Sequence, residues 1–233
     1  MTYTLAQLCE QLAYDELSTL AIAGQFNGFL DEKREAQIVS LTNSALLDLY
    51  SVFVLKEDEV VIKLSETRTL YPLQVAYSQT NGTAADRFIQ DSVDFPYTGD
   101  ALRILSATSE HGRPIPINDS GLPGSIFTPS PTVLQIPCDC GYDVLGVTYQ
   151  ASHPTLTATD MAAEIQLPQV LWPALRSWIA YRVFSALGTE AAKMTAGEHF
   201  AAYQRVVDMV KEQDLVSNSQ SVSTHKFCSN GWV

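Results

Sequence analysis

Charged side chains are scarce in this sequence, and basic ones are the scarcest. Only 17% of the 233 residues are Asp, Glu, Lys or Arg, and 26 acidic residues against 14 basic ones give a formal net charge of −12. The lysines are scattered along the chain and form no run. Because tight nucleic-acid binding needs a basic patch that displaces counterions from phosphates, this composition argues against such a function. A surface with so few charges indicates a subunit that partner contacts cover in an assembly.

An apolar run long enough to cross a membrane is also missing. The most apolar stretch, residues 165–187, is interrupted by Arg176 and Arg182, whereas a spanning helix needs about 20 apolar residues in succession. The mean hydropathy of +0.02 is ordinary for a soluble globular protein. The first twelve residues show neither the basic start nor the apolar block of a signal peptide, so we expect a protein without a membrane span that stays in the cytoplasm where it is made.

Cysteine is rare, and its spacing supports neither a disulfide framework nor a metal site. Cys9 and Cys228 stand alone, and only Cys138 and Cys140 are close together. Their spacing places both thiols on one face of a strand, but no second pair of Cys or His residues follows at the spacing of a zinc site. We therefore expect packed thiols in a β region and no bound metal.

The motifs of common enzymes are missing as well. The four histidines have no partner at a recognised spacing, and His199 is not part of a His-Glu-x-x-His motif. The Gly-Leu-Pro-Gly segment at 121–124 lacks the Lys-Ser/Thr of a phosphate-binding loop, and no Gly-x-Ser-x-Gly elbow occurs. Asp91 and Asp94 are spaced as a carboxylate pair can be, but a solvated loop or helix end explains them better. We expect no enzymatic activity, no catalytic residue and no cofactor.

The pattern of residues 1–70 predicts two helices followed by a strand. Thr4 is a suitable N-cap for the first helix, and Asp31 opens a longer second helix with an acidic first turn. After that helix the period changes to two over residues 60–64, which predicts a strand preceded by a turn at 57–59. The buried stripe of the long helix is expected to be Ile38, Leu41, Ala45, Leu49 and Val52.

Proline and glycine gather between residues 71 and 154. Nine of the eleven prolines and seven of the twelve glycines lie there, and lysine is absent. So many prolines and glycines exclude long helices in this region but permit short strands. We expect a β-rich insertion at 71–158 with a long loop at 118–131. Its strands should lie near 102–108, 114–117, 132–136 and 144–150.

Helical patterns return at about residue 160 and continue to 215. Gly188 can end one helix in a left-handed conformation and Thr189 can cap the next, which predicts a helical hairpin within 159–215. The predicted fold class is α+β, with a mainly α-helical bundle core formed by 1–70 and 159–215, the Pro/Gly-rich β insertion, and a flexible C-terminal arm. The inward residues of the hairpin are expected to include Leu175, Ile179, Phe200, Tyr203, Val207 and Val210.

Residues 216–233 are that C-terminal arm, and they show no core pattern. The segment is polar and rich in serine, so that alone it should be disordered, yet its tip carries Phe227, Trp232 and Val233. A flexible segment with apolar anchors at its tip suits docking on another molecule, because it loses conformational entropy only when it binds.

Four segments carry a resemblance to a known family: the long helix at 36–50, the strand and turn at 67–73, the hairpin at 171–214 and the closing residues 227–233. In these segments and their order, the chain resembles the head-to-tail adaptor (connector) proteins of tailed bacteriophages. The resemblance spans most of the chain, although the β-rich insertion is longer than the smallest adaptors carry. In such proteins a helical core forms a ring, commonly a dodecamer, beneath the portal.

The resemblance implies a structural virion protein of the phage neck. Its partners would be further copies of itself in a ring, the portal protein, and a tail or nozzle protein on the side of the β part. Double-stranded DNA would leave through the ring's channel without sequence-specific binding, and an acidic ring would repel its phosphates. The C-terminal arm would reach the portal, which makes Phe227, Trp232 and Val233 the portal-docking residues. Assembly would take place in the host cytoplasm.

Two other interpretations stay open. The first is a different assembly protein, either another neck or tail-completion protein or a cytoplasmic scaffold that oligomerises through its helical hairpin. The second is an enzyme whose site is assembled across subunits. The mass of the free protein and its behaviour with a purified portal would distinguish them.

Overall fold

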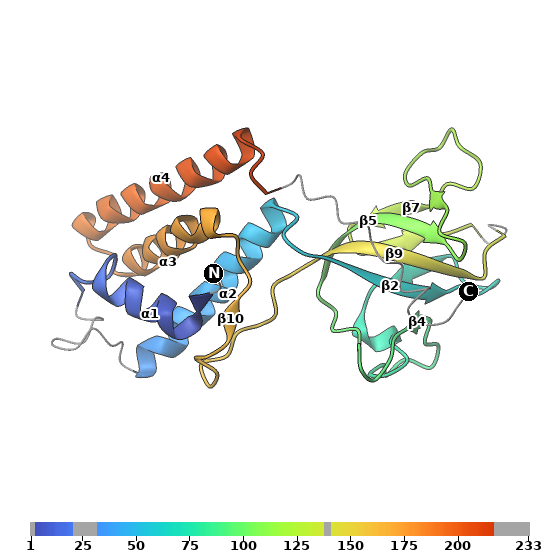
Figure 1. Cartoon of the computed structure of the whole chain (residues 1–233), viewed down its shortest axis with the longest axis horizontal. Helices are drawn as coiled ribbons and strands as arrows, with labels where there is room; N and C mark the ends of the chain where they lie inside the picture. Colours follow the sequence, from blue (N-terminus) through green and yellow to red (C-terminus); the bar gives the residue numbers. More distant parts are fainter. Residues whose placement is uncertain (1–2, 21–31, 138–140, 217–233) are drawn as a thin grey trace. The chain divides into compact units, whose positions relative to one another are not determined.

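The computed structural model describes residues 3–20, 32–137 and 141–216 (Figure 1). Over these residues the chain is α+β, with four α-helices and several antiparallel sheets. It divides into two compact units. Residues 3–55 and 153–216 form a helical unit, and residues 56–152 form a β unit. The four domain ranges expected from the sequence stay predictions.

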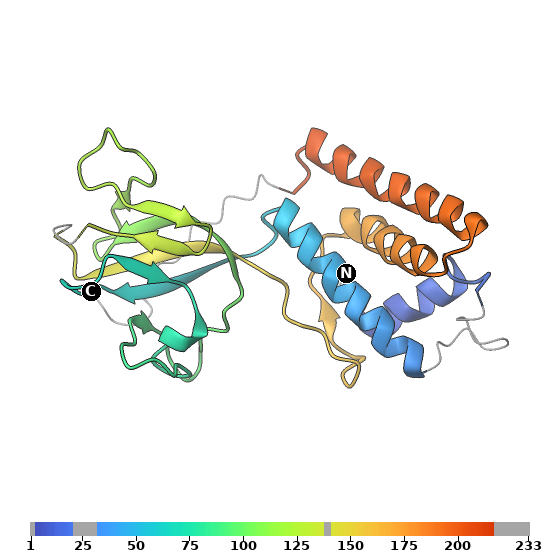
Figure 2. The same cartoon turned by 180° about the vertical axis from the view of Figure 1, so that it is seen from behind.

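In the helical unit, α3 and α4 pack side by side as an antiparallel hairpin, with α2 against α3 (Figures 1 and 2). The strands β1 and β10 pair antiparallel, with Tyr3 opposite Ile165. The hydroxyl of Tyr203 on α4 donates to a carboxylate oxygen of Asp48 on α2. The elements are β1 (Tyr3–Thr4), α1 (Leu5–Tyr14), α2 (Glu32–Val52), β10 (Glu164–Ile165), a 3-10 helix (Gln169–Leu171), α3 (Trp172–Ala186) and α4 (Glu190–Glu212).

Local sequence signals explain where these helices begin and end. The Thr4 hydroxyl accepts from the Gln7 amide at 3.3 Å, and the Gln7 side chain accepts from the Thr4 amide at 3.0 Å, a reciprocal cap. Gly188 has φ +73°, and the Thr189 hydroxyl accepts from the Ala192 amide at 3.2 Å. The predicted helical hairpin is therefore confirmed, for the reasons that predicted it.

The core of the helical unit contains most of the predicted residues. Leu175 and Ile179 are fully buried, and Tyr203, Val207 and Val210 are also buried. Two predicted core residues are wrong. Val52 is 38% exposed, because Tyr50 in the last turn of α2 and Phe53 just after the helix are buried instead, and Phe200 is 37% exposed beside the ring of Tyr181.

The helix expected from about residue 160 begins only at Trp172. Between these positions lie β10 and the 3-10 helix, and β10 is held as a strand by its pairing with β1. Pro168 caps the 3-10 helix and also disfavours helical geometry in the residue before it. None of the helices in the described part of the chain is long and apolar enough to span a membrane.

The β unit contains two antiparallel sheets that share one core, to which Ile62, Tyr71 and Leu145 contribute. The strand orders are β4-β2-β9-β5-β6 and β3-β8-β7. The elements are β2 (Glu57–Lys63), β3 (Leu70–Pro72), a 3-10 helix (Val75–Tyr77), β4 (Ile89–Gln90), β5 (Ala101–Ser109), β6 (Pro114–Ile115), β7 (Phe127–Ser130), β8 (Val133–Gln135) and β9 (Val144–Ala151).

Two local predictions about this unit are wrong. Residues 57–59 do not form a turn but the start of β2, because β2 pairs with β9 along its whole length, from Glu57 opposite Gln150 to Lys63 opposite Val144. The loop expected at 118–131 contains β7, which pairs with β8. The expected strands coincide with β5, β6, β8 and β9.

Candidate functional site

The portal-docking residues predicted from the sequence, Phe227, Trp232 and Val233, lie outside the described residues. Cys138 and Cys140 lie outside them too. Within the described ranges, no group of three or more His, Cys, Asp or Glu residues is arranged to hold a metal ion.

The histidines that the structure describes have structural surroundings. His153 is buried, and its Nε2 accepts from the Gln166 amide at 3.0 Å while its Nδ1 lies 2.6 Å from the carbonyl of Pro154. His199 stacks on Phe184, with ring centroids 5.4 Å apart. The third described histidine, His111, is exposed, and its Nε2 lies 3.6 Å from a carboxylate oxygen of the neighbouring Glu110.

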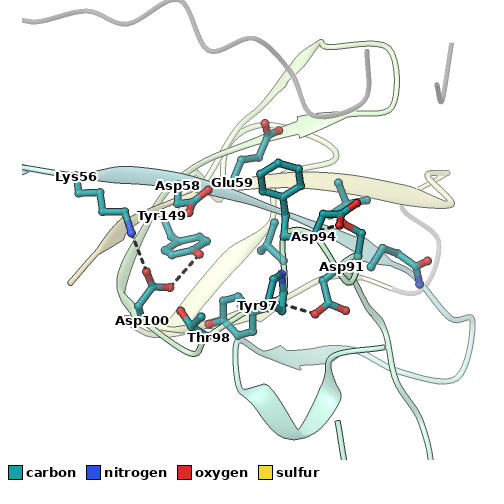
Figure 3. Close-up of a pocket in the computed structure, with 15 residues that line it drawn as sticks. Lys56, Asp58, Glu59, Asp91, Asp94, Tyr97, Thr98, Asp100 and Tyr149 are labelled. Atoms are coloured by element: carbon teal, nitrogen blue, oxygen red, sulfur yellow. Dashed lines mark hydrogen bonds and ion pairs between the residues drawn. The ribbon is translucent and has the colours of Figure 1, made fainter. Parts of the chain in front are cut away.

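The β unit contains a pocket of about 660 Å³ beside β2, β9 and the loop that follows β4 (Figure 3). This size is typical of sites that hold a small ligand or a few side chains of a partner. Its lining residues are Lys56, Asp58, Glu59, Val60, Val61, Gln90, Asp91, Ser92, Asp94, Phe95, Pro96, Tyr97, Thr98, Asp100 and Tyr149.

Asp91 organises the loop that forms one wall of the pocket. Its carboxylate accepts from the Ser78 hydroxyl at 2.7 Å, from the Tyr97 amide at 2.9 Å and from the Thr80 amide at 3.0 Å. Burial alone would raise the pKa of Asp91, but these hydrogen bonds stabilise the charged form and hold its pKa below the usual 3.8. Asp91 therefore lies in a loop, as expected from the sequence, and its carboxylate is a structural anchor of that loop.

On the opposite side of the pocket, Asp100 contacts two other lining residues, Lys56 and Tyr149. Its carboxylate lies 3.2 Å from Lys56 Nζ and accepts from the Tyr149 hydroxyl at 3.1 Å. Burial, together with the carboxylates of Asp100 and Asp58, raises the pKa of Tyr149. Tyr149 therefore stays neutral and acts as a hydrogen-bond donor to Asp100, as Figure 3 shows.

The lining of the pocket carries a surplus of negative charge. Its lining includes neither His nor Cys, and Lys56, its one basic residue, is paired with Asp100. Five carboxylates line it: Asp58, Glu59, Asp91, Asp94 and Asp100. A concave surface with surplus negative charge attracts cationic groups.

Sequence reasoning did not find this pocket. Asp91 and Asp94 were its only signal, because Asp58 and Glu59 lie on β2, far from them in the sequence, and Asp100 near the end of the same loop belongs to no recognised motif. The pairing of β4 with β2, and of β5 with β9 beside β2, brings the loop and β2 together. A pocket built by non-local pairing leaves no local motif.

The helical unit offers a second kind of surface. Large apolar side chains are exposed on its helices, including Leu47 on α2 and Met194 and Met209 on α4, which are 50%, 71% and 41% exposed. From Ala36 onward, the exposed positions of α2 carry no charged residue. They are Ala36, Gln37, Ser40, Ser44, Leu47, Ser51 and Val52.

A family model described as SU10 adaptor protein matches residues 3–224, which takes in both units. No curated protein matches the chain. Because the family match covers nearly the whole sequence, the chain belongs to the SU10 adaptor protein family, a family of phage head-to-tail adaptors.

Proposed function

We propose that this protein is a structural component of the virion neck that forms a ring beneath the portal, connects the portal to the tail or nozzle, and lines the DNA exit channel. The family match over residues 3–224 carries the proposal. We place the ring between capsid and tail, assembled in the host cytoplasm and without enzymatic activity of its own.

The exposed surfaces of the helical unit support self-association. A ring built by one repeated contact needs two different, complementary patches on each subunit. The uncharged face of α2 from Ala36 onward and the exposed methionines of α4 are two such candidates. Depletion of charge and enrichment in Met are features of interface cores. We propose a dodecamer, following the resemblance.

Portal binding is assigned to the C-terminal arm, residues 216–233, with Phe227, Trp232 and Val233 as anchors. Buried aromatic side chains dominate the affinity of many protein interfaces. Fully extended, such a segment spans up to ~60 Å, enough to run along a neighbouring protein.

The acidic character of the chain supports the channel role. With a net charge of −12 per subunit, a ring carries a strong negative field, and the share of it that faces the channel would repel the phosphates of passing DNA. DNA would then slide through without sequence-specific contacts, because neither unit shows a basic run.

The direct test combines the mass of the free protein with negative-stain imaging after mixing with the purified portal. We expect a ring that stacks coaxially on the portal, and no ring on the portal when residues 216–233 are deleted. The circular dichroism of the shortened chain should match that of the full chain. A protein that never binds the portal would favour a different neck protein or a scaffold, and attachment of the shortened chain at wild-type affinity would remove the docking role from the arm.

A further inference from the structure

One wall of the pocket in the β unit joins an exposed aromatic ring to an exposed carboxylate. Phe95 is 76% exposed, and the preceding Asp94 is exposed with no hydrogen-bond or ion-pair partner within the described part of the chain. Val93, 83% exposed, continues the apolar surface of the same loop. Neighbouring apolar side chains with such exposure are typical of interaction sites, since water contact with them is unfavourable.

The loop presents these groups from a fixed backbone. Asp91 anchors it at one end through Ser78, Thr80 and the Tyr97 amide. Within it, the Phe95 amide donates to the Ser92 carbonyl at 3.1 Å. The Tyr97 hydroxyl donates to the Leu73 carbonyl at 3.1 Å, which holds the loop against the core. A binding surface ordered in advance loses less entropy when a partner binds.

The charges of the pocket indicate the chemistry of the occupant. Five carboxylates line it, and Lys56, the one lining cation, is paired with Asp100. The surplus favours a cationic group. A small polyamine would neutralise the carboxylates but leave the Phe95 ring in water. A cationic side chain next to an apolar one would pair with the carboxylates and also cover the ring.

Within the described ranges, one unpaired donor, the Nε2 atom of Gln90, is buried near this wall of the pocket. Gln90 lines the pocket, and this buried amide nitrogen has no hydrogen-bond partner among the described residues. Buried amide donors are normally paired. Because this nitrogen is closed off from solvent, it does not indicate the occupant, and the choice rests on the carboxylates and on Phe95.

We infer that this pocket binds a short segment of a partner protein in the assembly, in which a Lys or Arg stands next to a large apolar residue. The inference rests on the proposed function, which gives the protein neighbours other than its own copies. The cation lies against Asp94 and over the ring of Phe95, where the negative face of the ring also attracts it. The apolar neighbour packs against Phe95 and the loop.

The experiment uses the full chain and a blocked synthetic peptide, Gly-Ser-Arg-Phe-Ser-Gly. Line broadening of the peptide's NMR resonances reports its affinity, and hydrogen–deuterium exchange of the protein reports its location. We expect saturable binding at peptide concentrations up to ~5 mM, with slower exchange at residues 57–61 and 90–98. A peptide with Glu in place of Arg should not bind.

Matched variants test the two contacts separately. Asp94→Asn should weaken binding about threefold at low salt, the usual scale of an exposed charge pair, and Phe95→Ser should weaken it about tenfold, as for a central aromatic contact. The controls are Glu66→Gln and Leu122→Ser, which change an exposed carboxylate and an exposed apolar residue elsewhere in the β unit. Both controls should bind like the wild type.

Several results would overturn the inference. These are absence of binding, protection outside the pocket loop and β2, affinity unchanged by either pocket variant, and equally tight binding of spermidine. If the wild-type protein does not bind the peptide, and Asp94→Asn or Phe95→Ser abolishes self-association, the pocket binds a second copy of this chain instead. Ring formation on the portal is measured independently, so failure of the peptide to bind leaves that result intact.

Discussion

The helical unit and the β unit bury their apolar residues in different ways. In the helical unit the core is built from stripes that repeat along single helices, such as Ile38 and Leu49 of α2 or Leu175 and Ile179 of α3. In the β unit the core depends on strands from distant parts of the sequence, such as β2 with β9, where Val60 lies opposite Val147.

The comparison explains where the two candidate surfaces occur. A helix is held by local contacts and can leave one long side exposed to solvent, as the uncharged face of α2 is. Sheets made from non-local contacts bring carboxylates from two distant segments to one place, as in the pocket, where Asp58 of β2 lies near Asp94 and Asp100 of the loop between β4 and β5. Faces suit repeated subunit contacts, and a pocket suits recognition of a particular segment.

The largest expected effect tests whether the helical stripe is the core. Leu175→Asp or Ile179→Asp should prevent folding of the helical unit, because an unpaired buried charge costs well above ~3 kcal/mol. Thermal unfolding followed by circular dichroism measures this. Met194→Asp, at a side chain 71% exposed, is the control and should change stability by about 0.5 kcal/mol or less. Soluble Ile179→Asp with an unchanged melting curve would place α3 outside the core.

The next effect tests the non-local core of the β unit. Leu145→Ala removes a fully buried side chain on β9, and we expect a loss of about 2–5 kcal/mol. Because the substitution lies in one unit, hydrogen–deuterium exchange should rise in residues 56–152 and stay near the wild-type rate in α3 and α4. Leu122→Ala, in an exposed loop, should leave both units unchanged. Equal loss of protection in both units would show that they unfold together.

A smaller effect tests the local signals of the helical unit. Thr189→Ala removes the side-chain cap that accepts from the Ala192 amide, and we expect a loss of about 1 kcal/mol. Urea unfolding gives the free energy. Thr189→Ser keeps the hydroxyl and should restore most of the stability. No difference between the Ala and Ser variants would mean that the cap does not contribute.

The smallest effect tests the loop anchor in the β unit through pH. The folded state holds the pKa of Asp91 below 3.8, so its stabilising contribution is complete above that pH and is lost as the pH falls through the lower, folded pKa. Asp91→Asn should therefore lower the melting temperature at neutral pH and approach the wild type in acid. Asp94→Asn, whose carboxylate has no partner in the described structure, should match the wild type throughout. A constant difference between Asp91→Asn and wild type would exclude the titration of Asp91 as its cause.

Much of the helical unit was predictable, because its signals are local. The Thr4 cap, the long helix, and the Gly188-Thr189 break each depend on residues within a few positions of one another, and each is confirmed. The errors fall where tertiary contacts compete with the pattern. Val52 and Phe200 fit the helical period but lie at the surface, because neighbouring elements cover other sides of these helices.

The sequence alone determined the α+β composition, the hairpin and the resemblance to phage adaptors, since periodicity, capping and element order are written along the chain. Tertiary structure alone decided that residues 57–59 extend β2, that Asp91 anchors a loop, and that carboxylates from β2 and from the loop between β4 and β5 share a pocket. The physical reason is that strand pairing joins residues far apart in the chain, so its register and the sites beside it depend on contacts that no local pattern contains.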